Sequence, residues 1–394
     1  MVDYASTRAP ATRRSREAAG ATSLLRLLDW ILLLAVAGLV GYGLWVISGI
    51  TRNDVPGDPH YYLVRQAIFV AAGVLLLVVA FFVDPDLLRR YNRVLYAVSL
   101  GLMVLVIVAG TVARGSRRWI DLSFFRFQPS EFVKLLLVLF LAGLLADRAK
   151  RAHELRTPLL AVGLAVPPIL LVFLQPDIGS ALVYAVALAG ALFVAGTRWL
   201  HLGLLAVVAL LACLAVLWWL PASGVEVLKP YQQARLTGFT NPDQDPRGTT
   251  YNVRQSITAV GAGGLDGRGV GGATQTNLNY LPEHATDFAF ASLAEQRGFL
   301  GAVLLLVLYA LVAWRGLKIV TSARDAFSTV AAGGIVVALL FQVFVNVGMT
   351  MGIAPVTGIP LPFVSVGGSS MVSNLVAIGV LQAIHARGRL RRWS

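Results

Sequence analysis

Three short motifs place charged residues in a chain that is otherwise apolar. Glu131 and Lys134, in Gln-Pro-Ser-Glu-Phe-Val-Lys, are three residues apart and therefore share one face of a helix. Asp177 follows Gln-Pro, and Asp287 ends the motif Leu-Pro-Glu-His-Ala-Thr-Asp. Charged side chains near lipid are expensive, so several of them at one face of a membrane predict a polar site there.

Asp287 has the best position for catalysis. It lies where a long polar loop descends into an apolar helix, and a carboxylate partly removed from water there can act as a general base. The alternative is an ordinary acid at a helix N-terminus, stabilised by the helix dipole. Glu283 and His284 are candidates for tuning Asp287 or for binding a divalent cation, and a solvated loop is the alternative for both.

The other polar candidates each have a structural alternative. Glu131 and Lys134 could form an ion pair at a helix end, and Asp177 could bond the backbone of its own turn. Ser369 and Ser370 follow the Gly-Gly of an irregular apolar segment, where they either cap the last helix or bond a ligand.

The segment 111–127 carries an unusual density of positive charge for a short outer loop. Its arginines are Arg114, Arg117, Arg118 and Arg126. Arginine binds phosphate groups through two parallel hydrogen bonds. The segment therefore predicts either an anionic ligand at the outer surface or contact with lipid headgroups.

The composition excludes a water-soluble protein. Of the 394 residues, 57% are hydrophobic and 13% are charged, and the mean hydropathy is +0.72. Soluble domains carry about 25% charged residues. The one cysteine, Cys213, lies in an apolar run, so neither an internal disulfide nor a cysteine-based metal site is expected. The net charge of +13 indicates basic cytoplasmic loops rather than nucleic-acid binding.

Ten apolar segments, each near the length that a bilayer requires, predict an all-α polytopic membrane protein. The expected helices are 24–50, 62–83, 88–110, 129–146, 157–174, 178–196, 199–220, 298–316, 325–350 and 367–386. The segments on the side of the two termini hold 20 of the 33 Lys and Arg residues, which places both termini in the cytoplasm. All three acidic motifs then lie at the outer face.

We expect one membrane domain, 24–386, between cytoplasmic tails at 1–23 and 387–394. It contains a large extracytoplasmic loop, 221–297, between helices 7 and 8. A tight outer hairpin at 175–177 connects helices 5 and 6, because only Gln-Pro-Asp separates them.

Two parts of the large loop have recognisable patterns. Residues 251–260 have the spacing of an amphipathic helix lying on the membrane. Gly267, Gly269 and Gly272 formally match GxGxxG, the fingerprint of a dinucleotide site. No strand–turn–helix unit surrounds these glycines, which favours a turn.

The motifs taken together resemble the SEDS family of shape, elongation, division and sporulation proteins, and within it the elongation-type, RodA-type branch. The matching stretches, in family order, are Gly115–Ile120, Phe127–Lys134, Gln175–Gly179, Tyr231–Arg235, Pro282–Glu295 and Gly358–Ser370. The stretch 272–280 favours the elongation branch. The family commonly has Pro-Glu-x-His-Thr-Asp, whereas His284 stands one place earlier, and it often has Glu-Glu where this chain has Glu295-Gln296.

The resemblance implies a peptidoglycan glycosyltransferase in the bacterial cytoplasmic membrane that polymerises lipid II at its extracytoplasmic face for cell elongation. It implies Asp287 as the catalytic residue, with Glu131, Lys134 and Asp177 lining the adjoining cavity. Arg117, Arg118 and Lys134 are candidates for holding the leaving pyrophosphate, and Glu295 is a candidate for tuning the site. The partners implied are a class B penicillin-binding protein and the elongation machinery.

The sequence leaves open the metal requirement, the activity and the branch of the family. Mg²⁺ or Mn²⁺ is the candidate cofactor, with Asp287, Glu283 and Glu131 as its candidate ligands, and no organic cofactor is expected. The alternatives to elongation-type polymerisation are a lipid II flippase, a scaffold that recruits a transpeptidase, and a division-type polymerase. Crowding of the charges at one face argues against the flippase, because transporters commonly carry their sites near the midplane of inverted repeats.

Overall fold

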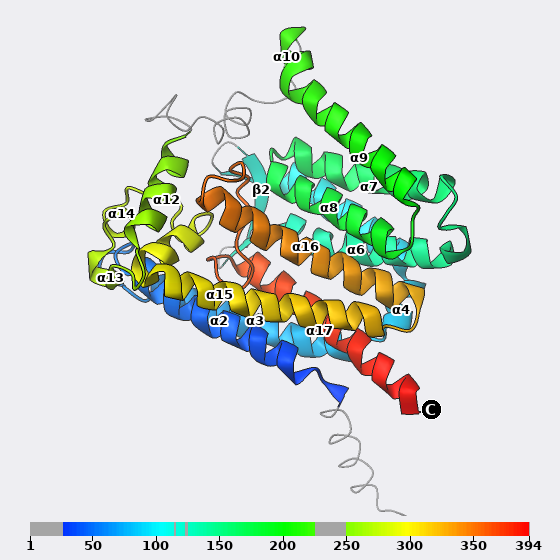
Figure 1. Ribbon diagram of the computed structural model, residues 1–394, viewed down its shortest axis with the longest axis horizontal. Coiled ribbons are helices and arrows are strands. Elements are labelled where there is room, and N and C mark those ends of the chain that lie inside the picture. The colour runs from blue at the N-terminus through cyan, green and yellow to red at the C-terminus, as the bar shows by residue number, and fades with distance from the viewer. Residues whose placement is uncertain (1–26, 114–115, 123–124, 225–249, 394) are drawn as a thin grey trace, which may run out of the picture.

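The computed structural model describes residues 27–113, 116–122, 125–224 and 250–393 (Figure 1). Arg114, the expected tail 1–23 and the part of the large loop at 225–249 lie outside the described residues. The first helices are α2 (Trp30–Ile50), α3 (Tyr61–Phe82), α4 (Pro85–Arg90), α5 (Asn92–Ala109), α6 (Pro129–Asp147), the 3-10 turn η1 (Ala149–Arg151), α7 (Arg156–Leu174) and α8 (Ile178–Val194). They are followed by α9 (Trp199–Leu214), the π-helical turn η2 (Ala215–Trp219), α10 (Leu220–Ala222), α12 (Tyr251–Ala262), α13 (Gly269–Gly272), α14 (Thr274–Asn277), α15 (Ala289–Ser322), α16 (Ala326–Thr350) and α17 (Gly368–Trp393).

The prediction of a polytopic helical membrane protein is confirmed. Within the described residues, nine helices are long and apolar enough to cross a membrane, and α8 is a shorter apolar helix. The tight hairpin is present, because α7 ends at Leu174 and α8 begins at Ile178. The helix α2 begins at Trp30, where the side chain of Asp29 accepts a hydrogen bond from the Leu32 amide and caps the helix; the expected start at 24 is in the part of the chain that the structure does not describe. The last helix continues past 386 to Trp393.

The eighth span begins earlier than the sequence indicated. α15 starts at Ala289, and Gly298 interrupts it with a φ of 66° and a ψ of −165°. The expected start at 298 therefore marks a kink inside one long helix. A glycine suits this position, because other residues rarely adopt a positive φ.

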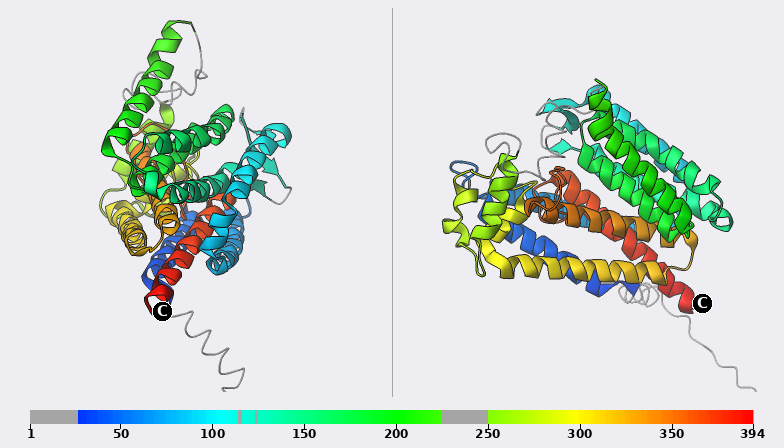
Figure 2. Two further views of the ribbon diagram at one scale, coloured as in Figure 1. Left: turned by 90° about the vertical axis from the view of Figure 1, so that its right-hand side faces the viewer. Right: turned by 45° about the horizontal axis from the view of Figure 1, so that its top comes forward.

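The centre of the bundle is formed by α6, α16 and α17, most of whose residues are buried. α17 packs along α3, and α16 packs against α6, α8 and α15. In contrast, the span formed by α9, η2 and α10 has no buried residue in its apolar window, and it protrudes from the bundle in Figure 1 and in the left view of Figure 2. Apolar side chains that are exposed on α9 are therefore exposed to lipid in a membrane.

The arginine-rich segment forms a small antiparallel sheet that the sequence did not indicate. Its strands are β1 (Thr111–Ala113), β2 (Ser116–Asp121) and β3 (Arg126–Phe127), in the order β1-β2-β3. Thr111 pairs with Trp119, and Ile120 pairs with Phe127. Because side chains alternate between the faces of a strand, neighbouring arginines on β2 point in opposite directions.

The large loop folds against the bundle. The expected amphipathic helix is present as α12, but its buried residues Val253 and Ala259 pack with Phe288 and Met349 rather than on a membrane surface. The glycine-rich segment forms a turn at 263–266, as expected, and then the short helix α13 at Gly269–Gly272. Gly267 has a φ of 84°, and the backbone at 264–265 accepts hydrogen bonds from the amides that follow the kink of α15.

A buried ion pair ties three helices together far from the acidic motifs. Arg315 of α15 donates to both carboxylate oxygens of Asp29 at 2.5–3.0 Å. Gln382 of α17 accepts from the Asp29 amide at 2.9 Å and donates to its carbonyl at 3.0 Å. A buried carboxylate needs such partners, so these bonds fix the start of α2 against the C-terminal halves of α15 and α17.

Candidate active site

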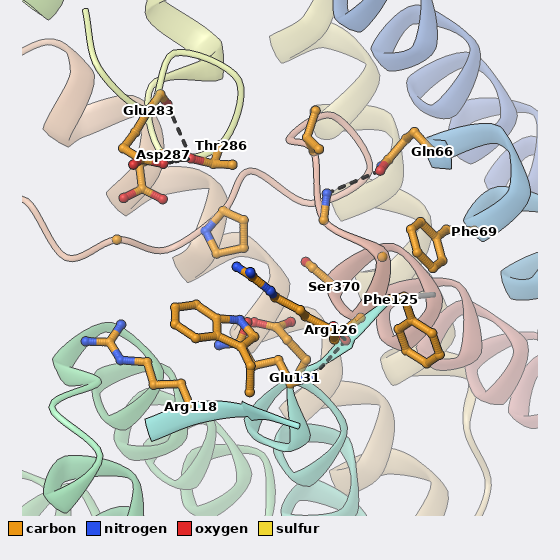
Figure 3. A pocket seen from close by; sticks show the side chains of 18 of the residues that line it. Gln66, Phe69, Arg118, Phe125, Arg126, Glu131, Glu283, Thr286, Asp287 and Ser370 are labelled. Atoms are coloured by element: carbon orange, nitrogen blue, oxygen red, sulfur yellow. Dashed lines mark hydrogen bonds between the residues drawn. The ribbon is translucent and has the colours of Figure 1, made fainter. Parts of the chain in front are cut away.

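A cavity of about 710 Å³ lies where the acidic motifs meet. Its wall includes Tyr62, Arg65, Gln66, Phe69, Arg118, Trp119, Asp121, Phe125, Arg126, Gln128, Glu131, Asp177, Ser180, Asn252, Pro282, Glu283, Thr286, Asp287, Gly358, Pro360, Ser369 and Ser370. Figure 3 shows Glu283, Thr286 and Asp287 on one side of it and Arg118, Arg126 and Glu131 on the other. The volume is within the usual range of sites for small ligands, roughly 300–1,000 Å³.

The cavity is placed at the N-terminal ends of alternate helices. The lining residues of α3, α6, α8 and α17 all lie within the first three turns of those helices, and Asp287 lies two residues before the start of α15. In a chain of ten spans, every second helix begins at the same face, so their N-termini can meet. The N-terminus of a helix carries a partial positive charge and free N–H groups, which favour an anionic ligand.

Asp287 is half-buried on the wall of the cavity. Its carboxylate faces Gly358, because a Cβ built on Gly358 would lie 3.5 Å from Asp287 Oδ2. Gly358 has a φ of 73° and also lines the cavity. The segment 357–360 therefore forms a close backbone wall beside the carboxylate.

Glu131 and Lys134 are both buried and bonded to each other. Lys134 Nζ lies 3.1 Å from Glu131 Oε2 and 3.2 Å from Gln342 Oε1. Glu131 lines the large cavity, whereas Lys134 lines only a void of about 10 Å³ beside it. Lys134 is therefore part of a structural ion pair, as the alternative proposed, whereas Glu131 belongs both to this pair and to the wall of the cavity.

Asp177 is buried, lines the cavity and caps α8. It accepts hydrogen bonds from the Ser180 amide at 3.1 Å and from Ser180 Oγ at 2.9 Å. Gln128 Nε2 lies 3.4 Å from Asp177 Oδ2, and Arg118 Nη1 lies 4.0 Å from Asp177 Oδ1. The expected turn aspartate and the expected cavity residue are therefore the same side chain.

The arginines of the sheet divide between the cavity and the surface. Arg118 lines the cavity and donates to the carbonyl oxygens of Gln175 and Pro176, so it holds the hairpin that carries Asp177. Arg117, its neighbour on β2, is exposed, lies outside the cavity and is 3.5 Å from the Ile107 carbonyl. The structure does not bring Arg117 to the site, because successive residues of a strand face opposite ways.

The two serines of the last motif line the cavity. Ser369 Oγ accepts from the Gln128 amide at 2.9 Å and donates to the Arg126 carbonyl at 3.4 Å. Ser370 Oγ accepts from Asn374 Nδ2 at 3.2 Å. Ser369 thus joins the start of α17 to the segment that connects β3 with α6.

Glu283 and His284, which precede Asp287, have different environments. Glu283 lines the cavity and accepts a hydrogen bond from Thr286 Oγ1 at 2.9 Å. His284 is outside the lining, and its Nε2 lies 3.0 Å from Asp54 Oδ1 in the α2–α3 loop. Burial lowers the pKa of His284, but the hydrogen bond and the charge of Asp54 outweigh it, so the pKa is raised from its ordinary value.

Glu295 is not brought to the cavity. It is completely buried and accepts hydrogen bonds from the amides of Gln275 and Thr276 and from Thr276 Oγ1 at 2.7–3.0 Å. Its carboxylate therefore fixes the loop at α14 to α15, and a direct influence on Asp287 is not supported.

The candidate metal ligands do not form one set. Among the described residues, no three His, Cys, Asp or Glu side chains gather closely enough to hold a metal ion. Glu283 and Asp287 are adjacent, but Glu131 lies on the other side of the cavity (Figure 3). Three or more oxygen ligands are usual for a protein-held divalent cation, so a requirement for Mg²⁺ or Mn²⁺ stays a prediction from the sequence.

Sequence reasoning missed two polar residues of α3. Arg65 and Gln66 both line the cavity, and Gln66 is almost completely buried. Gln66 Oε1 accepts from the Gly367 amide at 3.2 Å, and its Nε2 donates to the Ser365 carbonyl at 3.3 Å. An Arg-Gln pair inside an apolar span is itself a signal of a polar site, because such residues rarely face lipid.

Comparisons with known proteins agree on one family. The FtsW/RodA/SpoVE family model, described as cell cycle protein, matches residues 26–390. The chain is 36% identical to peptidoglycan glycosyltransferase MrdB of Escherichia coli over 363 residues, which cover 92% of this chain and 95% of that protein. It is also 36% identical to stage V sporulation protein E of Bacillus subtilis, over 91% of this chain and 95% of that protein.

Two solved structures are similar over most of the chain. One is described as "Structural coordination of polymerization and crosslinking by a peptidoglycan synthase complex"; it has a TM-score of 0.77 and 32% identity, over 92% of this chain and 98% of that chain. The other is the rod shape determining protein RodA of Thermus thermophilus, with a TM-score of 0.64 and 29% identity, over 91% of this chain and 96% of that chain.

Proposed function

The chain belongs to the FtsW/RodA/SpoVE family, and from that premise we propose that it is a peptidoglycan glycosyltransferase that polymerises lipid II for cell elongation. The observation that carries the proposal is the single cavity that contains Asp287, Glu131, Asp177 and three arginines. A general base and a cluster of guanidinium groups in one polar cavity are the groups that displacement of a pyrophosphate by a sugar hydroxyl requires.

In the proposed reaction, Asp287 takes the proton from a hydroxyl of the acceptor sugar. The oxygen attacks the anomeric carbon of the donor, the bond to polyprenyl pyrophosphate breaks, and the pyrophosphate leaves with the bonding electrons. One displacement inverts the anomeric centre. A positioned base contributes roughly 10²–10⁴-fold, and holding the two sugars in line supplies much of the rest.

The leaving pyrophosphate would be stabilised by Arg65, Arg118 and Arg126, which line the cavity. The helix N-termini that converge on it add partial positive charge of the same sign. This assignment replaces Arg117 and Lys134 of the sequence-based hypothesis. Arg117 lies outside the cavity, and Lys134 is bonded to Glu131 and Gln342.

We further propose that the protein lies in the bacterial cytoplasmic membrane with the cavity at the extracytoplasmic face. The distribution of Lys and Arg supports this orientation, because basic loops stay in the cytoplasm. The likeness to a chain of a peptidoglycan synthase complex supports a class B penicillin-binding protein as the partner, within the elongation machinery. Depletion of the protein should then produce round cells, whereas filaments would indicate the division branch.

The experiment compares Asp287→Asn with the wild-type protein and with Asp266→Asn, each given labelled lipid II. Asp266 is an exposed acid of the same large loop and lies outside the cavity, so its variant is a matched control. We expect the control to make glycan at the wild-type rate and Asp287→Asn to lose activity by at least about 10²-fold. Full-rate polymerisation by folded Asp287→Asn rejects the proposed base.

A further inference from the structure

The loop that carries Asp287 is held at four successive carbonyl oxygens by donors from three other segments. The donors are Ser292 Oγ, the Val366 amide, Ser365 Oγ and Asn346 Nδ2, which bond the carbonyls of residues 284, 285, 286 and 287 at 3.3, 2.9, 2.5 and 2.9 Å. The last of these is the bond to the backbone of Asp287 itself. Such a series fixes the backbone from which the carboxylate projects.

Asn346 connects the loop of Asp287 to a second segment through its side-chain amide. It lies in the apolar helix α16 and is completely buried. Its Nδ2 donates to the Asp287 carbonyl at 2.9 Å and to the Ile359 carbonyl at 2.8 Å. Because both acceptors are carbonyl oxygens, the amide nitrogen must face them, and its orientation is determined.

The two carbonyls belong to the loop that carries Asp287 and to the segment that lies beside its carboxylate. Ile359 follows Gly358, the backbone wall beside Asp287 Oδ2, and precedes Pro360, which lines the cavity. One NH₂ group therefore sets the distance between the loop of Asp287 and that wall.

We propose that Asn346 is a positioning residue for catalysis, which holds Asp287 at the distance and angle that proton removal from the acceptor requires. The inference rests on the proposed role of Asp287 as general base. Asn346 does not line the cavity, so it acts through the backbone and touches no substrate. Misplacement of a catalytic group by about 1 Å can cost about 10²-fold in rate.

The test uses Asn346→Leu, which has a similar size but no donor, and Asn346→Ser, a smaller polar variant that can bond only one of the two carbonyls. The control is Thr350→Val, one turn further along α16. Thr350 is also completely buried, but its hydroxyl bonds only the Val347 carbonyl of its own helix. Each purified full-length variant is assayed with lipid II for kcat, KM and the pH dependence of the rate, and folding is checked by size-exclusion chromatography and thermal unfolding.

We expect Asn346→Leu to lower kcat roughly 10–10²-fold with KM within about twofold of wild type, and Thr350→Val to leave both unchanged. The rise of the rate with pH should keep its midpoint, because the base is still present. Asn346→Ser decides the question if Asn346→Leu does not fold. A wild-type kcat in a folded Asn346 variant overturns the inference, and so does a loss confined to KM. If Asp287→Asn is inactive while Asn346→Leu is fully active, only the positioning role fails; a fully active Asp287→Asn removes the proposed base itself.

Discussion

Lys134 offers the sharpest test of how charge is arranged in this cavity. The sequence suggested a cation for the pyrophosphate, whereas the structure pairs Lys134 with Glu131 at 3.1 Å and leaves both side chains less than one-tenth exposed. If Lys134 serves only to neutralise Glu131, the single variant Lys134→Met should be harmful because it leaves a buried carboxylate without its partner.

The magnitude follows from that burial. Removing one member of a buried ion pair costs about 3–5 kcal/mol, and we expect the lower end because Glu131 also touches the cavity and can draw water from it. Replacing both members with uncharged groups of similar shape is often neutral. The double variant Glu131→Gln/Lys134→Met should therefore recover most of the thermal stability that Lys134→Met loses.

The assay is thermal unfolding in detergent together with glycan synthesis from lipid II, for the wild type, both single variants and the double variant. We expect stability and activity to fall in Lys134→Met and to return together in the double variant, to within about tenfold of the wild-type rate. A double variant that is as stable as wild type but inactive would refute the reasoning, because it would show that Lys134 or Glu131 acts on the substrate directly. A double-mutant cycle gives the coupling between the two residues.

Three further outcomes follow from the site and its supports. Arg118→Ala should lower the rate about 10–10²-fold, since it lines the cavity, whereas Arg117→Ala should leave it unchanged in the same lipid II assay. Gly358→Ala should lower the free energy of unfolding by about 1–2 kcal/mol, measured by thermal unfolding, because the φ of 73° at this position is strained for any residue with a Cβ. Gly358→Val should also lower kcat, because its larger side chain crowds the catalytic carboxylate. Because the pKa of His284 is raised in the folded protein, its charged bond to Asp54 stabilises the fold at and below about pH 6.5. This stabilisation is lost as the pH rises through the higher folded-state pKa. The difference in melting temperature between wild type and Asp54→Asn should therefore shrink at alkaline pH.

The sequence was sufficient for the elements that hydropathy controls. Ten apolar helices were expected, and the tight hairpin at 175–177, which contains Asp177, followed from its three-residue length. The common location of Glu131, Asp177 and Asp287 in one cavity also followed, because successive spans run in opposite directions and alternate helices therefore start at the same face. These features depend on length and periodicity, which a single sequence contains.

The features that the sequence did not reveal depend on contacts between distant segments. Nothing local to Asn346 indicates that its amide reaches carbonyls at 287 and 359, and nothing local to Glu295 indicates that it bonds the amides at 275 and 276. The division between Arg117 and Arg118 required the strand β2, whose alternation decides which guanidinium faces the cavity. For the adjacent residues Arg117 and Arg118, the sequence alone therefore did not indicate which guanidinium group lines the cavity.

The cavity combines two sources of positive charge that respond differently to mutation. Arg65, Arg118 and Arg126 are side chains and can be removed one at a time, whereas the N-termini of α3, α6 and α17 belong to the backbone. The N-terminus of α8 is already satisfied by Asp177, so it contributes less to an incoming anion. Because the backbone charge remains after any arginine is replaced, no single arginine substitution should abolish binding of a pyrophosphate. The general base has no such reserve in the backbone. The loss of Asp287, whose carboxylate lies beside Gly358 in the cavity, should therefore be far more damaging than the loss of any one cation.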